Sequence, residues 1–419
     1  MLTRRGLGLA VAATTALAVR PAWAQSPLSA AQQFMIEGRY LPQYLELKAQ
    51  AAAGDAAAEG FLSQYAAFLG DEATAIGGQE RVRPVDAALP DLEGAQSQDA
   101  LSAIVAAAAD KQIVILNEAH NISGHRSFAA RVMRALRPLG FDTFAAETFI
   151  QPQEQAAPSM RRFRQGEPFH AGFGYYIADP VFAEAVREAA ALGYVFADYE
   201  WRWDQRPPQT ATMDEQSAVR EAAQASNLVE TVLKARPDAR IFVLCGYSHA
   251  MEVEGRGGLW FAARLKATTG IDPLTIEQSL NWPAMRPQAD APHVAAVLAR
   301  FQPTAPIIVS RNGRAFAHRD YEGRMDMSVF HPRLDRLSGR PGWLAADPAR
   351  KPVEVAIPVF EGTVLLQALH MGEGAVIPAD HLLLGAGQGR ATLLLRPGSY
   401  FLRLETVRGI EPAFGTVTV

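Results

Sequence analysis

The feature that most constrains the fold is an alternation, between about residues 100 and 312, of short β-rich apolar runs with amphipathic helical segments. This alternation is typical of a parallel sheet that carries helices on both faces. The expected strands are Gln112–Leu116, Thr143–Ala146, Tyr194–Tyr199, Ile241–Cys245, Leu274–Glu277 and Pro306–Ser310. The expected helices are Ser123–Arg137, Pro180–Ala191, Asp214–Ala235, Leu259–Thr268 and His293–Phe301. The sequence therefore predicts an α/β fold with a mostly parallel sheet and flanking helices.

The segments on either side of this core differ from it in character. Residues 25–95 are Ala-rich, with aromatic and Leu residues at helical spacings, and predict two helices. After Trp343 the chain has strand-like pieces with turn signals between them, at Val353–Val359, Thr363–His370, Ala391–Leu395 and Tyr400–Thr406. We therefore expect an α/β domain over residues 100–345 and a small β-sandwich domain over 350–419, for which packing or interaction is the default role.

Residues 1–24 have the pattern of an export signal. Paired arginines at Arg4-Arg5 precede an apolar run from Leu7 to Val19, and Ala22-Trp23-Ala24 has the form of a cleavage site. The arginine pair resembles a twin-arginine signal, a type that usually exports folded proteins. The apolar run is 13 residues long, whereas a membrane span needs about 20. We expect cleavage after Ala24, a periplasmic location and no membrane span in the mature chain.

Charge and cysteine content narrow the class of protein further. The chain has 40 Lys and Arg against 44 Asp and Glu, a net charge of −4, so it lacks the basic excess that binding to a phosphate backbone requires. Nucleic acid is therefore not an expected partner. Cys245 is the single cysteine, which excludes an internal disulfide, and its apolar strand predicts a buried structural thiol.

Polar residues follow four successive strands of the predicted sheet, where the ligands of an open α/β sheet bind. The four strand ends are Asn117-Glu118-Ala119-His120, Glu147, Asp198-Tyr199-Glu200 and Gly246-Tyr247-Ser248-His249. A polar residue at one strand end is most often simply solvated. Four such ends in succession, each with a carboxylate or an imidazole, indicate a site at this edge of the sheet.

Several neighbouring residues could complete such a site. His125 follows Ser123, an expected helix N-cap, and the positive helix end favours a neutral imidazole that binds a metal or accepts a proton; the alternative is a solvated side chain in the capping turn. Arg220, Gln224 and Asn227 form a polar stripe on one helix. If that stripe faces the strand ends, Arg220 can bind a carboxylate or phosphate, or hold a catalytic glutamate in place.

Two further features of these strand ends have alternative interpretations. The missing side chain of Gly246 would let a substrate approach the backbone, and the Tyr247 hydroxyl could donate a hydrogen bond. His249 itself could be a satisfied structural histidine. The aromatic cluster from Tyr199 to Trp203 either walls a pocket or packs under the loop at Pro207-Pro208.

The order of these motifs resembles the erythromycin esterase/ChaN-like superfamily, over about residues 100–280. Asn117-Glu118-Ala119-His120 with His125 is similar to its G-E-x-H opening, with Asn117 in place of the usual Gly, which could narrow the approach to the strand end. The further similar motifs are Ala145-Ala146-Glu147, Arg220-Glu221 with Asn227, and Gly246-Tyr247-Ser248-His249. The resemblance implies an α/β fold whose rim carries Glu118, His120, Glu147 and His249, with His125 matching the second His of the ChaN-like pattern.

Members of that superfamily differ in chemistry. Erythromycin esterases open a lactone with His-activated water, ChaN proteins bind haem iron, and the related TraB/GumN/TIKI group is linked to metal-dependent peptidase activity. The resemblance therefore implies one of these three chemistries for this chain. Asp326 to Leu344 matches none of the core motifs and is assigned no role.

The sequence thus predicts a hydrolase in which His120 or His249 takes a proton from water while Glu118 and Glu147 orient the imidazoles. Arg220 and Tyr247 would stabilise negative charge. The expected contacts to a small-molecule or peptide substrate are Tyr199, Glu200, Arg220, Asn227 and Tyr247. The bond cleaved is left open.

Three alternatives stay open at this point. A divalent metal held by His120, His125 and His249 is compatible with the ligand types, although the chain has no H-E-x-x-H signature. A haem- or iron-binding protein without turnover would need an axial His or Tyr and a large apolar pocket. A degenerate member would act only through its β domain.

Overall fold

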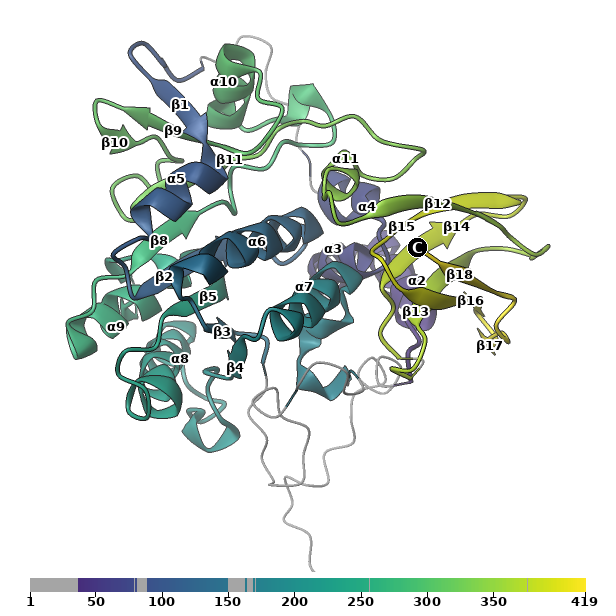
Figure 1. The fold of residues 1–419 in the computed structure, drawn as a ribbon, viewed down its shortest axis with the longest axis horizontal. Coiled ribbons are helices and arrows are strands. Elements are labelled where there is room, and N and C mark those ends of the chain that lie inside the picture. Colours follow the sequence, from purple (N-terminus) through teal and green to yellow (C-terminus); the bar gives the residue numbers. More distant parts are fainter. Residues whose placement is uncertain are drawn as a thin grey trace, which may run out of the picture.

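The central element of the protein is a sheet of nine strands, flanked by helices on both faces (Figure 1). The computed structural model describes residues 37–419 except 79, 81–88, 150–162, 164–168, 170, 256 and 375; the expected signal of residues 1–24 lies outside them. The strands are β1 (Gln96–Asp99), β2 (Ile113–Glu118), β3 (Thr143–Ala146), β4 (Val195–Ala197), β5 (Ile241–Gly246), β8 (Leu274–Glu277), β9 (Ile307–Arg311), β10 (Arg314–Ala315) and β11 (Met327–Phe330).

The strand order is β1-β9-β11-β8-β2-β5-β3-β4, with β10 beside β9. The run from β11 to β4 is parallel, and β1, β9 and β10 add antiparallel strands at one edge. The mostly parallel α/β fold predicted from the sequence is therefore confirmed. Strands β1, β10 and β11 were not predicted, and β11 lies in the segment from Asp326 to Leu344 that was assigned no role.

Each face of the sheet has its own apolar core because successive strand side chains point to opposite faces. Val114 and Leu116 of β2 face one layer, and Ile113 and Ile115 face the other. The first layer contains α5 (Ala100–Ala107), α6 (Ser123–Leu136) and α7 (Pro180–Ala191). The second contains α8 (Met213–Leu228), which continues as a π-helical turn over Val229–Leu233, and α9 (Phe261–Thr269). Helix α10 (Pro292–Phe301) packs with β9 and β11 in a smaller cluster.

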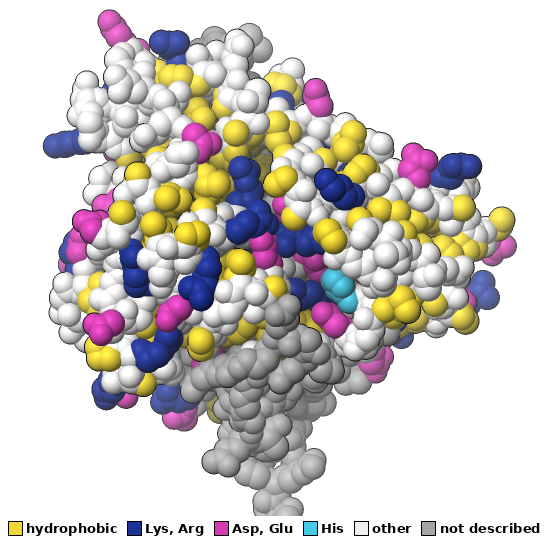
Figure 2. Space-filling view, viewed as in Figure 1, with side chains coloured by type: hydrophobic (Ala, Val, Ile, Leu, Met, Phe, Trp, Pro, Cys, Tyr) yellow, Lys and Arg dark blue, Asp and Glu magenta, His cyan; other side chains and the backbone are white. Residues whose placement is uncertain are grey.

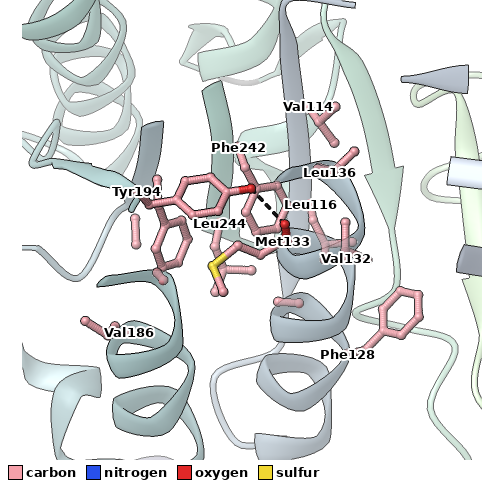
Figure 3. Packing of buried hydrophobic residues seen from close by; sticks show 14 of the residues in the cluster. Val114, Leu116, Phe128, Val132, Met133, Leu136, Val186, Tyr194, Phe242 and Leu244 are labelled. Carbon is pink, nitrogen blue, oxygen red and sulfur yellow. Dashed lines mark hydrogen bonds between the residues drawn. The ribbon is translucent and has the colours of Figure 1, made fainter. Parts of the chain in front are cut away.

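The contact between α6 and the sheet is shown in Figure 3. Val132, Met133 and Leu136 of α6 pack against the β2 and β5 side chains. The Tyr194 hydroxyl donates a 2.7 Å hydrogen bond to the Met133 carbonyl oxygen. This packing fixes α6, and with it the residues just before the helix, relative to the end of β2.

The chain path brings three strand ends together. After β2 the chain crosses to β3, and only later, through α8, returns to place β5 between them. The carboxyl ends of β2, β5 and β3 are therefore neighbours, although their sequences are far apart. Reversals of this kind are where open α/β sheets bind their ligands.

The C-terminal region forms a small domain of antiparallel sheets. β12 (Lys351–Ala356) pairs with β15 (Arg390–Leu395), and β13 (Val364–His370) pairs with β14 (Asp380–Leu384) and β16 (Ser399–Thr406), which also carries β17 (Gly409–Ile410) and β18 (Gly415–Thr418). Val355 and Leu393 of one sheet share a core with Leu366 and Leu402 of the other. The four expected strands are present, and β14, β17 and β18 were not predicted.

The N-terminal helices join the two domains. They are α2 (Leu41–Ala52), α3 (Ala56–Phe68) and the short α4 (Glu72–Gly77), one helix more than predicted. Tyr40, Tyr44 and Phe68 share a core with Leu365 of β13 and Ala178, which precedes α7. Within the described residues, no helix combines the length and apolar character needed to cross a membrane.

Charged side chains gather along the seam between the α/β domain and the C-terminal domain (Figure 2). Glu184 of α7 lies 2.7 Å from His370 Nε2 of β13, and Arg396 lies 2.5 Å from Glu188 and 3.0 Å from Asp347. These pairs connect α7 directly to the C-terminal domain, so the two domains are held together by ion pairs as well as by the shared helices.

Truncating the centre of the first core tests this packing. Phe242 is fully buried and stacks on Phe144, with ring centroids 5.6 Å apart. We expect Phe242→Ala to lower the free energy of unfolding by about 3–5 kcal/mol, because it leaves a cavity between α6 and the sheet. Val359→Ala, at a fully exposed position, should change it by less than about 0.5 kcal/mol. Urea unfolding of both variants measures the difference, and equal midpoints would contradict the packing described.

Candidate functional site

The ends of β2, β3 and β5 bring together the four rim residues predicted from the sequence. His120 Nδ1 lies 3.2 Å from Glu118 Oε1, and His120 Nε2 lies 3.3 Å from Glu147 Oε1. His249 Nε2 lies 3.6 Å from the other oxygen of Glu147. Glu147 is thus placed between the two imidazoles, and the four side chains form one continuous cluster.

A buried arginine holds Glu118 in its charged form. Glu118 continues the face of β2 that α6 covers, so its carboxylate meets Arg126 of α6, at 2.7 Å from Nη2 and 2.9 Å from Nε. Burial raises the pKa of Glu118, but Arg126 and His120 outweigh that effect and lower it to about 2. Glu118 is therefore an anion at any physiological pH, and its carboxylate can only accept a hydrogen bond from His120.

The same arginine is tied to the next helix. Arg126 Nη1 donates a 2.7 Å hydrogen bond to Asp179 Oδ2, and Asp179 caps α7 by accepting from the Val181 backbone N–H. Ser123 was predicted to be the N-cap of α6, but the N-cap residue is Ile122, which has no side-chain cap. The Ser123 hydroxyl donates instead to Asp179, at 2.7 Å. The prediction failed because a buried acid from another element competes for that hydroxyl.

Glu147 is oriented by the backbone of β5. Its Oε2 accepts a 2.8 Å hydrogen bond from the Gly246 N–H. Burial raises the pKa of Glu147, but His120, His249 and Arg220 together lower it below its ordinary value. A Cβ atom at Gly246 would lie 2.4 Å from His120 Cε1. The space left by this glycine is therefore filled by His120 itself, and not by a substrate as the sequence suggested.

His249 sits between an acid and an arginine. Its Nδ1 lies 2.7 Å from Glu221 Oε1, and its Nε2 lies 3.2 Å from Arg220 Nη1. Burial lowers the pKa of His249, but Glu221 and Glu147 raise it further, and the net change is upward. Because arginine can only donate, the neutral ring carries its proton on Nδ1, the nitrogen closer to Glu221, and its Nε2 lone pair accepts from Arg220.

The polar stripe of α8 faces the strand ends. Arg220 makes two bonds to Glu200, at 3.0 Å from Nε and 2.5 Å from Nη2, and Gln224 donates to the same carboxylate at 3.0 Å. Asn227 donates to the backbone carbonyls of Tyr199 and Glu200. Arg220 therefore holds a glutamate, one of the two roles proposed for it, and its guanidinium still reaches to 3.9 Å from Glu147.

Neither His125 nor Tyr199 reaches this cluster, and Asn227 contacts none of its four residues either. His125 is fully buried, its Nδ1 accepts from the Ala119 N–H, and its ring packs against Trp282 and His331. Burial lowers the pKa of His125 to about 3, so it is neutral as predicted, but it belongs to a separate aromatic cluster. Tyr199 is also fully buried and stacks on Phe261 of α9. The prediction failed for Tyr199 because a position next to a strand end does not decide which face the side chain takes. It failed for His125 because the ring packs into the aromatic cluster with Trp282 and His331.

Aromatic rings enclose His120. Tyr176, from a 3-10 turn over Tyr175–Ala178, stacks on it with centroids 4.6 Å apart, and Tyr247 meets it edge-on at 5.1 Å. Tyr247 has a φ of +38°, a strained backbone for this residue type, and its carbonyl accepts from the Asn117 side chain at 2.9 Å. Strain of this kind at a strand end is typical of functional sites.

Three residues that contribute to the cluster could not be identified from the sequence. Nothing in the sequence indicates that Arg126 is buried, because arginine on a helix is normally exposed. Tyr176 lies in an irregular segment without periodicity. Glu221 belonged to a motif but had no assigned role. Among the described residues, no group of three or more His, Cys, Asp and Glu has the arrangement of a metal site.

No family model matches the chain, and no curated protein matches it. Among solved structures it is similar to RRSP, a MARTX toxin effector domain from Vibrio vulnificus CMCP6, with 19% identity, 40% of this chain and 36% of that chain covered, and a TM-score of 0.30. It is also similar to the type III effector HopBA1, with 18% identity, 49% and 89% coverage, and a TM-score of 0.29. The chain thus spans about a third of the RRSP structure, and similarity at this level assigns neither family nor activity.

Acid unfolding tests the Glu118–Arg126 contact. A carboxylate whose folded pKa is lowered stabilises the fold above its ordinary pKa of 4.5, and that stabilisation is lost as the pH falls from there toward about 2. This contribution amounts to at most about 3 kcal/mol. We expect Glu118→Gln to be less stable than the wild type at pH 7 and to lose less stability between pH 4.5 and 2.5, as measured by urea unfolding at each pH. Parallel pH profiles would contradict the contact.

The titration of His249 tests its pairing with Glu221. The raised pKa means that this histidine stabilises the fold fully below about 6.5 and loses that contribution as the pH rises through the folded value. We expect a folded pKa above 6.5 by histidine NMR, and a lower one in Glu221→Gln. The amide oxygen of that variant can still accept from the Phe261 N–H, as Glu221 does at 2.7 Å, so the fold should survive. An unchanged pKa in the variant would contradict the pairing.

Proposed function

We propose that this chain is an exported hydrolase in which His120 takes a proton from water at the cluster of Glu118, His120, Glu147 and His249. The observation that carries the proposal is the position of His120, whose two ring nitrogens each face a carboxylate within 3.3 Å. An imidazolium formed by proton transfer would lie between two anions, which favours the transfer. The side chain is 14% exposed, so the ring reaches solvent.

The two histidines are not equivalent in this role. The Nε2 lone pair of His249 is directed at Arg220, so a guanidinium stands where a water would have to bind. His120 has no cation at its ring nitrogens, and Glu118, held charged by Arg126, fixes its Nδ1. We therefore assign the role of general base to His120. The role of His249 is to position Glu147 and Arg220.

The reaction is a water attack on a carbonyl or similar centre. The water donates one hydrogen bond to His120 Nε2 and the other to Glu147 Oε1, which lies 3.3 Å from that nitrogen and can only accept. The first of these protons passes to His120 Nε2, the hydroxide oxygen bonds to the substrate, and the bond to the leaving group breaks. The same proton then passes from His120 to the leaving group, so no other reactant is needed. Arg220 is 31% exposed and stabilises the negative charge that develops at the attacked centre.

Two further observations support the proposal. The order of the motifs resembles the erythromycin esterase/ChaN-like superfamily, whose erythromycin esterase members open a lactone with His-activated water. Residues 1–24 have the pattern of a twin-arginine signal, which favours a periplasmic enzyme acting on a small molecule or a peptide.

The haem alternative fits the site poorly. The cavity beside Glu118, Arg126, Glu147 and Tyr176 has about 190 Å³, and charged groups line it, whereas haem needs a large apolar pocket. A divalent metal fits no better, because a cation bound to His249 Nε2 would lie against the Arg220 guanidinium. We derive no step through either group.

Hydrolysis assays on the mature protein test the proposal. We expect hydrolysis of p-nitrophenyl esters or of chromogenic amides, and a loss in kcat/KM of about 100-fold or more for His120→Ala, since a general base contributes at least that much. Gly246→Ala should give a comparable loss with a retained fold, because its Cβ displaces the His120 ring. His318→Ala, whose ring packs on His293 outside the cluster, is the matched control and should keep full activity.

Three outcomes would contradict the proposal. The first is a wild-type protein that cleaves none of these substrates. The second is a His120→Ala variant of unchanged activity, which would favour a role that depends on the C-terminal domain alone. The third is a Soret band in the protein as isolated, which would favour haem binding.

A further inference from the structure

A buried glutamate lies at the end of β8, the strand beside β2, and the catalytic cluster does not include it. Glu277 is fully buried, and its carboxylate accepts hydrogen bonds at both oxygens. The Ser279 hydroxyl, at 3.0 Å, and the Leu280 N–H, at 2.8 Å, donate to Oε1. The side chains of Asn281 and Ser328 donate to Oε2. A buried network in which each member is satisfied rigidifies the segments that it joins.

Ser279 extends this network to Asn117 of β2. The single hydrogen of the Ser279 hydroxyl goes to Glu277, so its oxygen accepts from the Asn117 amide, at 3.3 Å. The Asn117 oxygen accepts from the backbone N–H groups of Gln278 and Ser279, which establishes which end of the amide is the donor. That donor also bonds to the Tyr247 carbonyl oxygen, at 2.9 Å. Glu277 is therefore joined to Tyr247 through two side chains.

Tyr247 is the exposed end of this chain of hydrogen bonds. Its φ of +38° is strained for a residue that has a Cβ atom, and such strain persists only where the surrounding structure fixes it. The bond from Asn117 to its carbonyl oxygen is one contact that fixes it. The Tyr247 ring meets His120 edge-on, with centroids 5.1 Å apart, and 39% of the residue is exposed. The ring thus borders both the proposed base and solvent.

We propose that Asn117 and Ser279 are positioning residues of the proposed hydrolase. Anchored on Glu277, they hold the Tyr247 ring beside His120, where it forms a wall against which the substrate binds. This inference rests on the proposed function, since that function makes His120 the base. The chain acts on substrate binding and not on proton transfer, because carboxylates hold the two ring nitrogens of His120 without it.

Ser279→Ala and Ser328→Ala are matched variants for a kinetic test. Each removes a buried hydroxyl that donates to Glu277, but the Ser279 hydroxyl continues to Asn117, whereas that of Ser328 is bonded to Asn281. With a p-nitrophenyl ester that the wild type cleaves, we expect Ser279→Ala to raise KM by about two- to tenfold, the effect of one lost hydrogen bond, with kcat unchanged. Ser328→Ala should change neither constant.

A double variant shows whether the effect passes through Tyr247. Tyr247→Ala should raise KM at least as much as Ser279→Ala does. Combining the two substitutions should raise KM no further than Tyr247→Ala alone, because residues that act through one contact are not additive.

Histidine NMR tests the same chain without a substrate. Since the Tyr247 ring lies against His120, we expect Ser279→Ala and Tyr247→Ala to shift the His120 ring resonance in the same direction, and Ser328→Ala to leave it in place. The His370 resonance, from the seam between the domains, should not move in any of them. Circular dichroism checks the fold, and Asn117→Ala breaks the chain at the next bond if Ser279→Ala does not fold.

The proposal is wrong if the His120 resonance of the folded variant, Ser279→Ala or Asn117→Ala, is that of the wild type. It is equally wrong if Ser328→Ala has the same effects as Ser279→Ala, or if the effects of Ser279→Ala and Tyr247→Ala on KM add. A wild type that cleaves no ester would overturn the proposed function instead, and the NMR comparison would still decide whether the chain holds Tyr247 against His120.

Discussion

The site depends on one buried cation, the Arg126 guanidinium, which is fully buried between Glu118 and Asp179. A buried arginine is costly unless its donors are satisfied, and removing one partner of such a group costs about 3–5 kcal/mol, since it leaves an uncompensated charge. Here the donors reach the end of β2, the cap of α7 and, at 3.2 Å, the His120 carbonyl oxygen. The arginine thereby fixes both the charge of Glu118 and the backbone that carries His120.

Charge alternates along the cluster from that arginine outward. Arg126 is followed by Glu118, His120, Glu147, and then by His249 and Arg220, which both face Glu147. Each carboxylate is bordered by groups that lower its pKa despite burial, so both acids are charged and both imidazoles lie in a negative field. The field acts differently on the two rings, because only His249 has a guanidinium against its Nε2. Under the proposed hydrolase function, this asymmetry is the reason for assigning the base to His120 and a positioning role to His249.

The sequence predicted the elements that form the site but not the contacts that tune it. Strands Thr143–Ala146 and Leu274–Glu277 have the predicted bounds, because short apolar runs between turn signals leave little choice of boundary. β1 was missed because Gln96–Asp99 is polar and exposed, so its strand character comes only from pairing with β9. The grouping of polar residues at the strand ends could be predicted because it follows from the topology of a parallel sheet. The contacts of Arg126 and Tyr176 depend on side-chain packing, which the periodicity of the sequence does not indicate.

At Asn117 the chain departs from the motif that it resembles, and the structure shows what this side chain does. The resembled pattern has glycine at this position, and a side chain there was expected to narrow the approach to the strand end. Because neighbouring strand residues point to opposite faces, Asn117 points away from Glu118 and binds the adjacent segments. Its amide donates to the Tyr247 carbonyl and to Ser279, and its oxygen accepts from the Gln278 and Ser279 N–H groups. A glycine side chain could make none of these bonds, so Asn117 is part of what holds Tyr247 in its strained conformation against His120, and its side chain does not lie on the face of β2 that carries Glu118.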